Sequence, residues 1–250
     1  MVDATIQARL GSSRLPGKVL EPILGRPLIE YQIERIRRSK IIKRVIIATT
    51  TNPQDDAIAE LAQRIGCECF RGSENDVVGR VLGALNKFGI EVNAEFQGDN
   101  SVPDPQIIDD VIGYYLEHCD DFDYVTNALK TTYPPGLEVS VYPRSVLADA
   151  ESRITEPSLR EYVGIHIYQH PERYRIKNLE APPEFTQPNL HLEVDTQEDF
   201  HLVAAIYEHF MPTKPEFSLA DVIAYTDANP HLARMNVNVE RRWKKFRDDD

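Results

Sequence analysis

Segments with strand-like and helix-like patterns alternate along the first half of the chain, and this alternation constrains the fold more than any other feature. Strands are predicted over residues 2–8, 44–50, 67–70, 91–97 and 123–128, where β-branched and other apolar residues cluster. Helices are predicted over residues 27–36, 52–65, 76–88 and 105–116, where apolar residues recur at helical spacing. Strands that alternate with helices pair in parallel through right-handed crossovers. The sequence therefore predicts an α/β fold with a doubly wound, mostly parallel sheet.

The loop after the first predicted strand concentrates positive charge in an acidic chain. The chain has 28 Lys and Arg residues against 40 Asp and Glu residues, a formal charge of −12 that disfavours binding to nucleic acid or anionic membranes. Residues 8–20, by contrast, contain Arg9, Arg14 and Lys18 and no acid. The glycine and serine residues between these cations allow tight turns that present backbone N–H groups to an anion. We therefore expect a local phosphate pocket beyond the carboxyl end of this strand, where doubly wound sheets bind ligands.

Two familiar phosphate-binding loops do not fit this segment. A Walker A loop has four residues between its glycines and a Ser or Thr after its lysine, whereas five residues separate Gly11 from Gly17 and a valine follows Lys18. The dinucleotide-binding pattern G-x-G-x-x-G is also absent from the sequence. An ordinary solvated surface loop is the alternative interpretation.

Cysteine usage and hydropathy narrow the class of protein. The three cysteines, Cys67, Cys69 and Cys119, are an odd number, which favours reduced thiols and a cytoplasmic location. No apolar run approaches ~18 residues, so we expect no membrane span. The N-terminal segment lacks the basic and then apolar pattern of a secretory signal, so none is expected.

The order of residues in the basic loop is more specific than its composition. Ala8-Arg9 followed by Ser12-Ser13-Arg14-Leu15-Pro16-Gly17-Lys18 resembles the signature loop of the CMP-sugar cytidylyltransferases, which include the KDO and acylneuraminate cytidylyltransferases. The string is most similar to the spore coat polysaccharide biosynthesis (SpsF) branch of that family. The resemblance implies that the loop wraps the triphosphate of CTP, with Arg9 and Lys18 as the main catalytic charges. It also implies nucleotide contacts from Ala8, Gly11, Ser12, Ser13, Arg14 and Gln97.

Two acidic segments are the candidates for a metal site. Asp99 follows a predicted strand in a Gln-Gly-Asp turn, and Asp195 lies in a Glu-Val-Asp-Thr segment. In the family that both segments resemble, these aspartates bind Mg²⁺, a hard cation that prefers carboxylate oxygens. The resemblance therefore implies a Mg²⁺ site formed by Asp99 and Asp195. The alternative interpretations are a turn residue for Asp99 and, for Asp195, a helix start capped by Asp199.

Further segments extend the resemblance over roughly residues 4–226. The string RGSENDVVGR, which begins at Arg71, lies beside the base and ribose in the family and implies nucleotide contacts from Arg71 and Ser73. A helix cap is the alternative for Ser73. The stretches around Asn127 and Glu138 border the sugar-acid pocket of the family and imply contacts with the acceptor.

The resemblance also implies an architecture and a reaction. The expected architecture is one nucleotide-diphospho-sugar transferase domain over residues 1–235, with a β-rich dimerisation arm and acceptor region over 130–190, and a tail over 236–250. The basic and aromatic residues of that tail are interpreted as a docked or frayed terminus. The expected reaction is Mg²⁺-dependent transfer of CMP from CTP to a small sugar acid, with release of pyrophosphate, for surface polysaccharide or glycoconjugate synthesis. A homodimer is expected from the resemblance alone.

Three alternatives stay open at the level of the sequence. The acceptor could carry a phosphate or phosphonate, or the nucleotide could be another one, because no residue visibly dictates cytosine. The chain could also be a nucleotide-binding module without turnover. The joint presence of Arg9, Lys18, Asp99 and Asp195 speaks against this last alternative.

Overall fold

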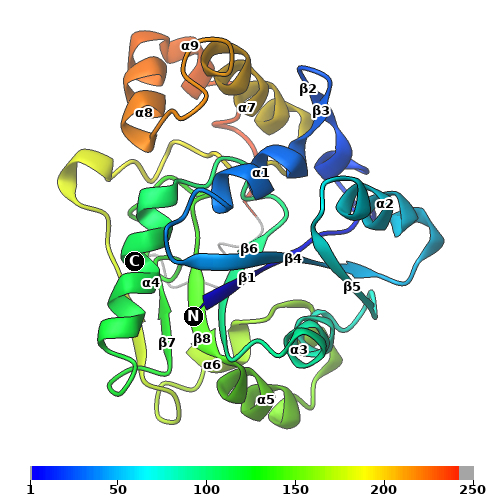
Figure 1. Cartoon of the computed structure of the whole chain (residues 1–250). Coiled ribbons are helices and arrows are strands. Elements are labelled where there is room, and N and C mark those ends of the chain that lie inside the picture. The colour runs from blue at the N-terminus through cyan, green and yellow to red at the C-terminus, as the bar shows by residue number, and fades with distance from the viewer. Residues whose placement is uncertain (1, 242–250) are drawn as a thin grey trace.

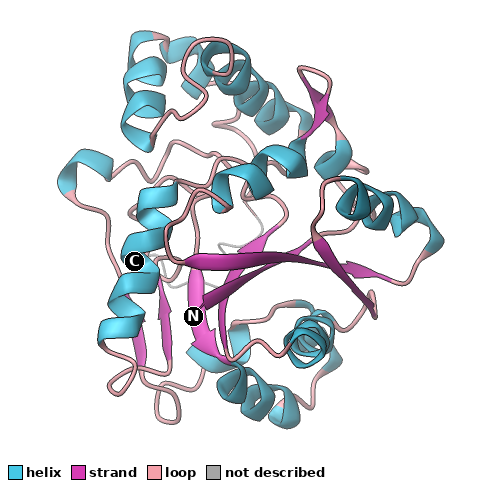
Figure 2. Ribbon diagram, in the orientation of Figure 1, coloured by secondary structure: helices cyan, strands magenta, loops and turns pink. Residues whose placement is uncertain are grey.

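The computed structural model describes residues 2–241 and has a seven-stranded sheet at its centre (Figures 1 and 2). The strands are β1 (Val2–Gln7), β4 (Ile42–Thr50), β5 (Glu68–Gly72), β6 (Val92–Gln97), β7 (Tyr124–Thr126), β8 (Ser140–Pro143) and β9 (Ile176–Asn178). Their order across the sheet is β5-β4-β1-β6-β8-β7-β9. Every neighbouring pair is parallel except the two that contain β8, which runs antiparallel to β6 and to β7. The predicted α/β fold with a mostly parallel sheet is therefore confirmed.

Helices cover both faces of the sheet, as expected of a doubly wound fold (Figure 1). One apolar cluster packs α1 (Leu28–Ile36), α2 (Asp56–Arg64), α4 (Pro105–Glu117), α7 (Gln197–Phe210), α8 (Leu219–Ala228) and α9 (Pro230–Ala233) on one side. A second cluster packs α3 (Val77–Phe88), α5 (Arg144–Arg153) and α6 (Ile165–Tyr168) on the other. Short 3₁₀ turns are η1 (Lys18–Leu20), η2 (Pro53–Asp55), η3 (Pro157–Glu161) and η4 (Pro183–Phe185), and a separate ribbon joins β2 (Pro22–Ile23) to β3 (Arg26–Pro27).

The β4 strand illustrates how the sequence builds these two layers. Val45 and Ile47 belong to the first apolar cluster. Ile46 and Ala48 belong to the second. Successive side chains of a strand point to opposite faces of the sheet, so a continuous apolar run is what a strand buried on both faces requires.

The elements predicted from the first half of the sequence are present, with shifts of a few residues at their ends. The helix predicted over residues 52–65, for example, begins as the 3₁₀ turn η2 and continues as α2. Buried or half-buried aspartates begin two other helices. Asp76 accepts a hydrogen bond from the Gly79 N–H at the start of α3, and Asp104 accepts one from the Gln106 N–H at the start of α4.

The β-rich arm expected over residues 130–190 is wrong. The strands of that stretch are β8 and β9, and both belong to the central sheet. The rest of the stretch consists of α5, α6, η3, η4 and connecting loops. The reason is that β8 forms ladders with both β6 and β7, so its hydrogen-bonding edges are satisfied inside the sheet rather than in a protruding ribbon.

The strand order changes direction next to β1. The chain runs outward from β1 through β4 to β5 and then returns, so that β6 pairs with the other side of β1. Such a switch point leaves a crevice beyond the carboxyl ends of the two central strands. The loop after β1 is the basic loop, and the loop after β6 contains Asp99. The fold therefore brings two of the predicted sites to one edge of the sheet.

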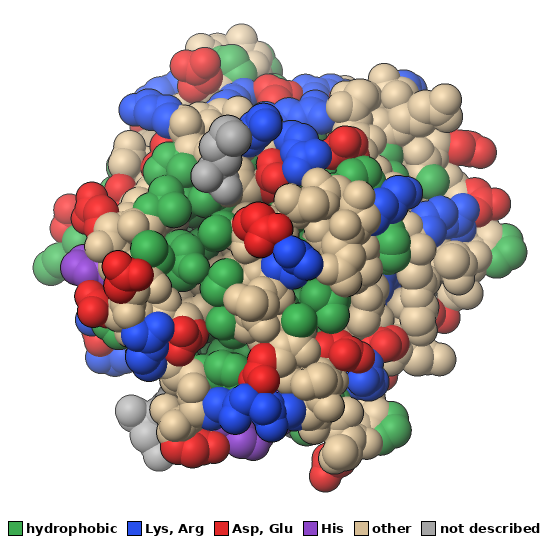
Figure 3. Space-filling model, turned by 60° about the horizontal axis from the view of Figure 1, so that its bottom comes forward, with side chains coloured by type: hydrophobic (Ala, Val, Ile, Leu, Met, Phe, Trp, Pro, Cys, Tyr) green, Lys and Arg blue, Asp and Glu red, His purple; other side chains and the backbone are tan. Residues whose placement is uncertain are grey.

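The charges of the chain are interspersed on the face drawn in Figure 3, where Lys and Arg side chains alternate with Asp and Glu rather than gathering into one broad basic patch. Among residues 2–241, no helix is long and apolar enough to cross a membrane. Residues 242–250, which contain most of the basic tail, lie outside the described residues.

Candidate active site

A close approach between β1 and β6 brings their loops together. The Gly98 N–H donates a hydrogen bond of 2.9 Å to the Gln7 carbonyl oxygen. A Cβ atom at position 98 would lie 2.9 Å from that oxygen and 3.3 Å from the Ala8 Cβ, so this turn has no room for a side chain. Asp99 follows the glycine and contacts Lys18 of the basic loop.

The basic loop is anchored at its start by a buried carboxylate. Asp55 is fully buried and accepts a 2.7 Å hydrogen bond from the Leu10 N–H and a short one from the Thr50 hydroxyl. The Gly17 N–H then donates to the Leu10 carbonyl at 2.9 Å and closes the loop on itself. Lys18 follows directly, and only 9% of it is exposed. The loop thus delivers a lysine into the interior of the site rather than into solvent.

Lys18 lies between two carboxylates that are distant in the sequence. Its Nζ atom is 3.3 Å from Asp99 Oδ2 and 2.9 Å from Asp195 Oδ1, so these two oxygens are no farther apart than the sum of the two distances. Arg14 adds a contact of 2.5 Å between its Nη2 atom and Asp195 Oδ2. We call Lys18, Asp99 and Asp195 the Lys–Asp cluster.

Backbone pairing explains why the second aspartate of the cluster reaches the first. The Val194 N–H donates to the Asp99 carbonyl at 3.0 Å, and Asn100 forms an antiparallel bridge with Glu193. The same segment runs tightly against Gly136, which has a φ of +106°. A Cβ at position 136 would lie 2.4 Å from the Glu193 nitrogen, so only glycine permits this approach.

Burial and charge act in opposite directions on the Lys–Asp cluster. Burial lowers the pKa of Lys18, but the two carboxylates outweigh it, so the pKa is raised. Burial raises the pKa of Asp195, but Lys18 and then Arg14 outweigh it, so the pKa is lowered. The pKa of Asp99 is raised, because burial and the nearby charges of Asp195 and Glu193 exceed the effect of Lys18.

Two pockets meet at this cluster. The first, which we call the loop pocket, is lined by the predicted nucleotide-binding residues of the basic loop, Ala8, Arg9, Gly11, Ser12, Ser13, Arg14 and Lys18. The second, which we call the sheet pocket, is lined by residues that include Glu95, Asn100, Tyr124, Glu138, Ser140 and Glu193. Six residues line both pockets: Gln7, Gln97, Asp99, Glu161, Tyr162 and Asp195. The loop pocket is suited to an anionic ligand, and the cluster stands at its border with the sheet pocket.

The loop pocket contains a buried arginine that sequence reasoning did not select. Arg80 is 3% exposed, and its Nη1 atom donates to the Ser73 carbonyl at 2.6 Å. Burial and the neighbouring Arg9 lower the pKa of Arg80 to about 10. Arg9 itself is more open, with 38% of its side chain exposed and a 3.8 Å contact with Glu74. The sequence feature that could have identified Arg80 is its position as the last residue of the string that begins at Arg71.

Two predicted nucleotide contacts lie outside both pockets. The guanidinium of Arg71 is occupied by the Thr50 carbonyl at 2.8 Å, the Asn52 carbonyl at 2.8 Å and Asp56 at 2.5 Å. Ser73 is also not among the lining residues; its carbonyl accepts the hydrogen bond from Arg80 described above. These two residues therefore support the loops around the site in this structure.

The two predicted acceptor residues differ in their positions. Glu138 lines the sheet pocket and accepts a 2.8 Å hydrogen bond from the Gly136 N–H. Asn127 is buried outside the lining, where its amide donates to the Leu137 carbonyl at 3.0 Å and accepts from the Val139 N–H at 2.8 Å. Asn127 thus fixes the segment that carries Glu138. The lining residues Tyr124 and Tyr162 were not predicted, since isolated tyrosines carry no motif.

The Lys–Asp cluster fits a divalent cation with incomplete protein ligation. Its carboxylates already converge on one cationic nitrogen atom, and oxygen ligands suit Mg²⁺. Within residues 2–241 no group of three or more His, Cys, Asp or Glu side chains is arranged to hold a metal. Mg²⁺ is commonly held by one or two carboxylates together with substrate phosphates and water, so a two-carboxylate site next to an anion pocket meets this requirement.

Comparisons with known proteins agree with this geometry. The sequence model of the cytidylyltransferase family matches residues 4–236. The chain is 33% identical over 234 residues to the spore coat polysaccharide biosynthesis protein SpsF of Bacillus subtilis, covering 91% of this chain and 95% of that protein. It is 29% identical to a cytidylyltransferase of known structure from Leptospira borgpetersenii, with a TM-score of 0.88 and coverage of 96% of this chain and 99% of that one.

A more distant structure shares the fold. The complex of CMP:2-keto-3-deoxy-manno-octonic acid synthetase with CTP has a TM-score of 0.64 at 18% identity, covering 83% of this chain and 98% of that one. The family match spans most of the chain and includes the basic loop and both aspartates of the Lys–Asp cluster. The chain therefore belongs to the cytidylyltransferase family of nucleotidyltransferases.

Proposed function

We propose that this protein transfers CMP from CTP to a hydroxyl group of a sugar acceptor, with Mg²⁺ bound and pyrophosphate released. The observation that carries the proposal is the position of the Lys–Asp cluster, at the border between a pocket rich in cations and a pocket rich in hydroxyl, amide and carboxylate groups. A transfer reaction needs its two substrates to meet at one charged centre. The loop pocket would hold the triphosphate, and the sheet pocket would hold the acceptor.

The residues of the chain supply positioning and charge. The acceptor hydroxyl loses its proton to solvent as its oxygen attacks the α-phosphorus, the bond to the bridging oxygen of the β-phosphate breaks, and pyrophosphate leaves with that electron pair. Arg9, Arg14 and Lys18 offset the negative charge of the phosphates and of the departing pyrophosphate. Asp99 and Asp195 would hold Mg²⁺, which supplies Lewis-acid stabilisation of the phosphate oxygens when bound. No residue needs to form a covalent intermediate.

The sheet pocket bears on the class of acceptor. None of the described residues that line it is Lys or Arg, whereas Glu138 and Glu193 are among them. Such a lining favours a polyhydroxylated acceptor and disfavours a distal phosphate. The sugar acid expected from the family fits if its carboxylate lies beside the attacking hydroxyl, where Lys18 and the metal site are within reach. The name of the distant synthetase, which acts on 2-keto-3-deoxy-manno-octonic acid, supports this choice.

The location of the protein in the cell and its oligomeric state are also part of the proposal. A cytoplasmic location rests on the odd number of cysteines. A homodimer rests on the resemblance to the family, now without a β-rich arm. Light scattering on the purified protein tests the dimer directly.

Pyrophosphate release tests the reaction. Wild-type protein, CTP and Mg²⁺ are combined with a panel of sugar acids, neutral sugars and sugar phosphates, and Asp195→Asn is the matched variant. We expect release that requires both CTP and a sugar acid and that is lost in Asp195→Asn. Nucleotide binding without release on any acceptor would favour a non-catalytic module. Release only with sugar phosphates would favour the alternative acceptor class.

A further inference from the structure

The end of the described chain packs into the segment that carries Asp195. Asn236 is 1% exposed, and its amide donates to the His191 carbonyl at 2.9 Å and to Asp199 Oδ1 at 2.7 Å. Only 2% of the Arg241 side chain is exposed. Asn236 and Arg241 are therefore docked against this segment, whereas Val237 between them is exposed. The match to the family ends at residue 236, before Arg241.

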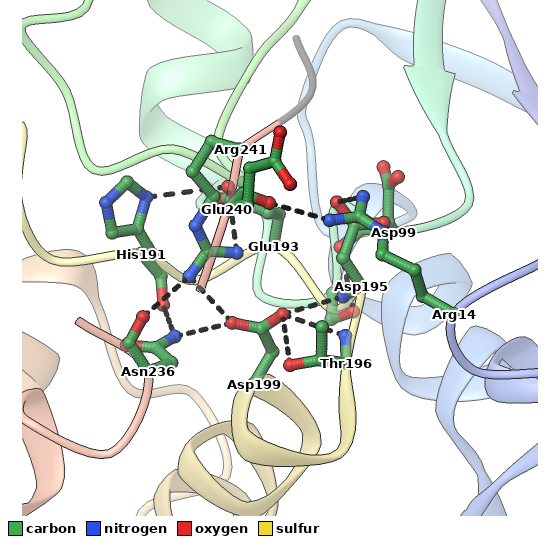
Figure 4. A network of polar contacts seen from close by, with 12 residues as sticks. Arg14, Asp99, His191, Glu193, Asp195, Thr196, Asp199, Asn236, Glu240 and Arg241 are labelled. Carbon is green, nitrogen blue, oxygen red and sulfur yellow. Dashed lines mark hydrogen bonds and ion pairs between the residues drawn. The ribbon is translucent and has the colours of Figure 1, made fainter. Parts of the chain in front are cut away.

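Arg241 joins two acids that flank the metal-binding aspartate in the sequence (Figure 4). Its Nη2 atom is 2.8 Å from Asp199 Oδ1, and its Nη1 atom is 3.3 Å from Glu193 Oε1. Asp199 is fully buried and Glu193 is 5% exposed. A buried carboxylate without a counter-charge is costly, so one guanidinium stabilises both acids where they stand.

Asp199 transmits this contact to the metal-binding residue. Its other oxygen, Oδ2, accepts hydrogen bonds from the Asp195 N–H at 3.0 Å and the Thr196 N–H at 2.9 Å. The guanidinium of Arg241 and the backbone of Asp195 are therefore bound to opposite oxygens of one carboxylate. Asp199 thus caps α7, and Arg241 fixes the cap.

The residue before Arg241 acts on the same aspartate from the other side. The Glu240 carbonyl accepts a 2.8 Å hydrogen bond from Arg14 Nη1, while Arg14 Nη2 contacts Asp195 Oδ2 at 2.5 Å. The backbone of Asp195 is held through Asp199, and its carboxylate is held through Arg14. Asp199 in turn contacts Arg241, and Arg14 in turn contacts Glu240, so both sets of contacts end at adjacent residues of the C-terminal segment.

We propose that Arg241 is a positioning residue that holds Asp195 in place for the metal, an inference that rests on the proposed Mg²⁺ site. Arg241 makes no hydrogen bond or ion pair with the Lys–Asp cluster among those described above; it acts on Asp195 through Asp199, and its charge also interacts with the Asp195 carboxylate. Residues behind a metal ligand typically change metal affinity by ~10–100-fold when they are replaced. An arginine with a purely structural role would change the melting temperature and leave the affinity of the folded protein for metal unaltered.

The test measures Mn²⁺ binding to the full chain by electron paramagnetic resonance, in the presence of CTP. Arg241→Gln removes the charge and is expected to weaken Mn²⁺ binding by ~10-fold or more. Arg241→Lys restores a charge but cannot bridge both acids with a planar fork, so we expect an intermediate affinity. The matched control is Arg175→Gln, which removes an exposed arginine paired with Asp123 at 2.8 Å and is expected to bind Mn²⁺ normally.

The outcomes separate this inference from the proposed function. Tight Mn²⁺ binding by wild type, Arg241→Gln and Arg241→Lys alike would overturn the positioning role and leave the metal site intact. A wild-type protein that binds no Mn²⁺ would overturn the metal site and the positioning role with it. If Arg241→Gln does not fold, Arg241→Lys decides: a wild-type affinity contradicts the inference, and a weakened affinity with a cooperative melting transition supports it.

Discussion

The Lys18 ammonium lies 2.9 Å from the Asp195 carboxylate, although 177 residues separate the two in the chain. The same nitrogen atom contacts Asp99 at 3.3 Å. One cation thus contacts two half-buried acids at the border between the loop pocket and the sheet pocket. This arrangement gives Lys18 two roles, one in the charge balance of the folded protein and one in the proposed reaction.

Lys18→Ala is expected to lower turnover by ~10²–10³, the usual effect of removing one preorganised electrostatic contact. Lys18→Arg should recover only part of this loss, because the guanidinium is longer and differently directed. The measurement is pyrophosphate release at saturating CTP. Lys130→Ala, which breaks an exposed 2.7 Å pair with Glu180, is the control and should be unaffected. Turnover of Lys18→Ala close to that of wild type would remove the lysine from the mechanism.

The same substitution is expected to destabilise the protein in a way that Mg²⁺ reverses. Without Lys18, the negative charges of Asp99 and Asp195 lose a neighbouring positive charge. We expect this loss to lower the free energy of unfolding by about 1–3 kcal/mol. A divalent cation between the two carboxylates would replace the ammonium. The melting temperature of Lys18→Ala should therefore fall in EDTA and recover on addition of Mg²⁺ by more than that of wild type. An equal response of both proteins to Mg²⁺ would argue that the ion does not bind between these acids.

Local sequence patterns were sufficient to predict the helices and strands that depend on residues close together in the sequence. The apolar runs of β1 and β4 and the capping pattern from Thr196 to Asp199 correspond to a strand pair and a helix start in the structure. The short strand β9 and the placement of β8 depend on pairing partners far along the chain, which local pattern does not encode. The β-rich arm, which was expected from the family resemblance, is wrong because β8 lies between β6 and β7 in the central sheet.

Site residues that belong to a sequence motif could be predicted. Site residues whose position depends on tertiary contacts could not. The basic loop and the two aspartates of the Lys–Asp cluster came from motifs, but their convergence depends on the hydrogen bond between Val194 and the Asp99 carbonyl. Arg71 and Asn127 have residue types suited to ligand contact, yet both are occupied by nearby backbone groups. Which polar side chains face a pocket is a property of packing, and the sequence alone did not distinguish them.

CTP is expected to raise the melting temperature in Mg²⁺ more than ATP, GTP or UTP at equal concentration. A ligand stabilises a protein in proportion to its preferential binding to the folded state, so the shift reports base preference. Differential scanning fluorimetry with the four nucleotides measures it. Equal shifts would mean that the loop pocket binds the triphosphate alone, which is contrary to a cytidylyl-specific site.

Sugar acids with the carboxylate beside the attacking hydroxyl are expected to be better acceptors than sugar phosphates. The described lining of the sheet pocket offers Glu138 and Glu193 and no Lys or Arg to a distal anion. We expect a ratio of about tenfold or more in kcat/KM, which corresponds to ~1.4 kcal/mol. Pyrophosphate release over a concentration series of each acceptor gives the ratio. Equal or better use of sugar phosphates would show that the acceptor does not occupy this pocket as proposed.

Glu95 is expected to make stability depend on pH. Burial raises its pKa from 4.5 to about 7, against hydrogen bonds from Tyr142 and Gln7. The folded state then binds this proton more tightly than the unfolded state does, so the stabilisation is complete below pH ~4.5 and lost as the pH rises through ~7. At pH 8, Glu95→Gln should be more stable than wild type by about 1–3 kcal/mol, which raises the melting temperature by ~2–4 °C per kcal/mol. At low pH the variant and the wild type should melt at similar temperatures. Glu91→Gln, at an exposed carboxylate, is the control, and an unchanged pH profile in Glu95→Gln would refute the assignment.

A crystal structure with CTP and Mn²⁺ would show whether the Lys–Asp cluster is the centre of nucleotide transfer. The anomalous signal of manganese locates the ion independently of the nucleotide density. We expect one manganese peak within bonding distance of Asp99 and Asp195, with the triphosphate in the loop pocket against Arg9 and Lys18. A triphosphate bound elsewhere, or a manganese peak that contacts neither aspartate, would contradict this role of the cluster.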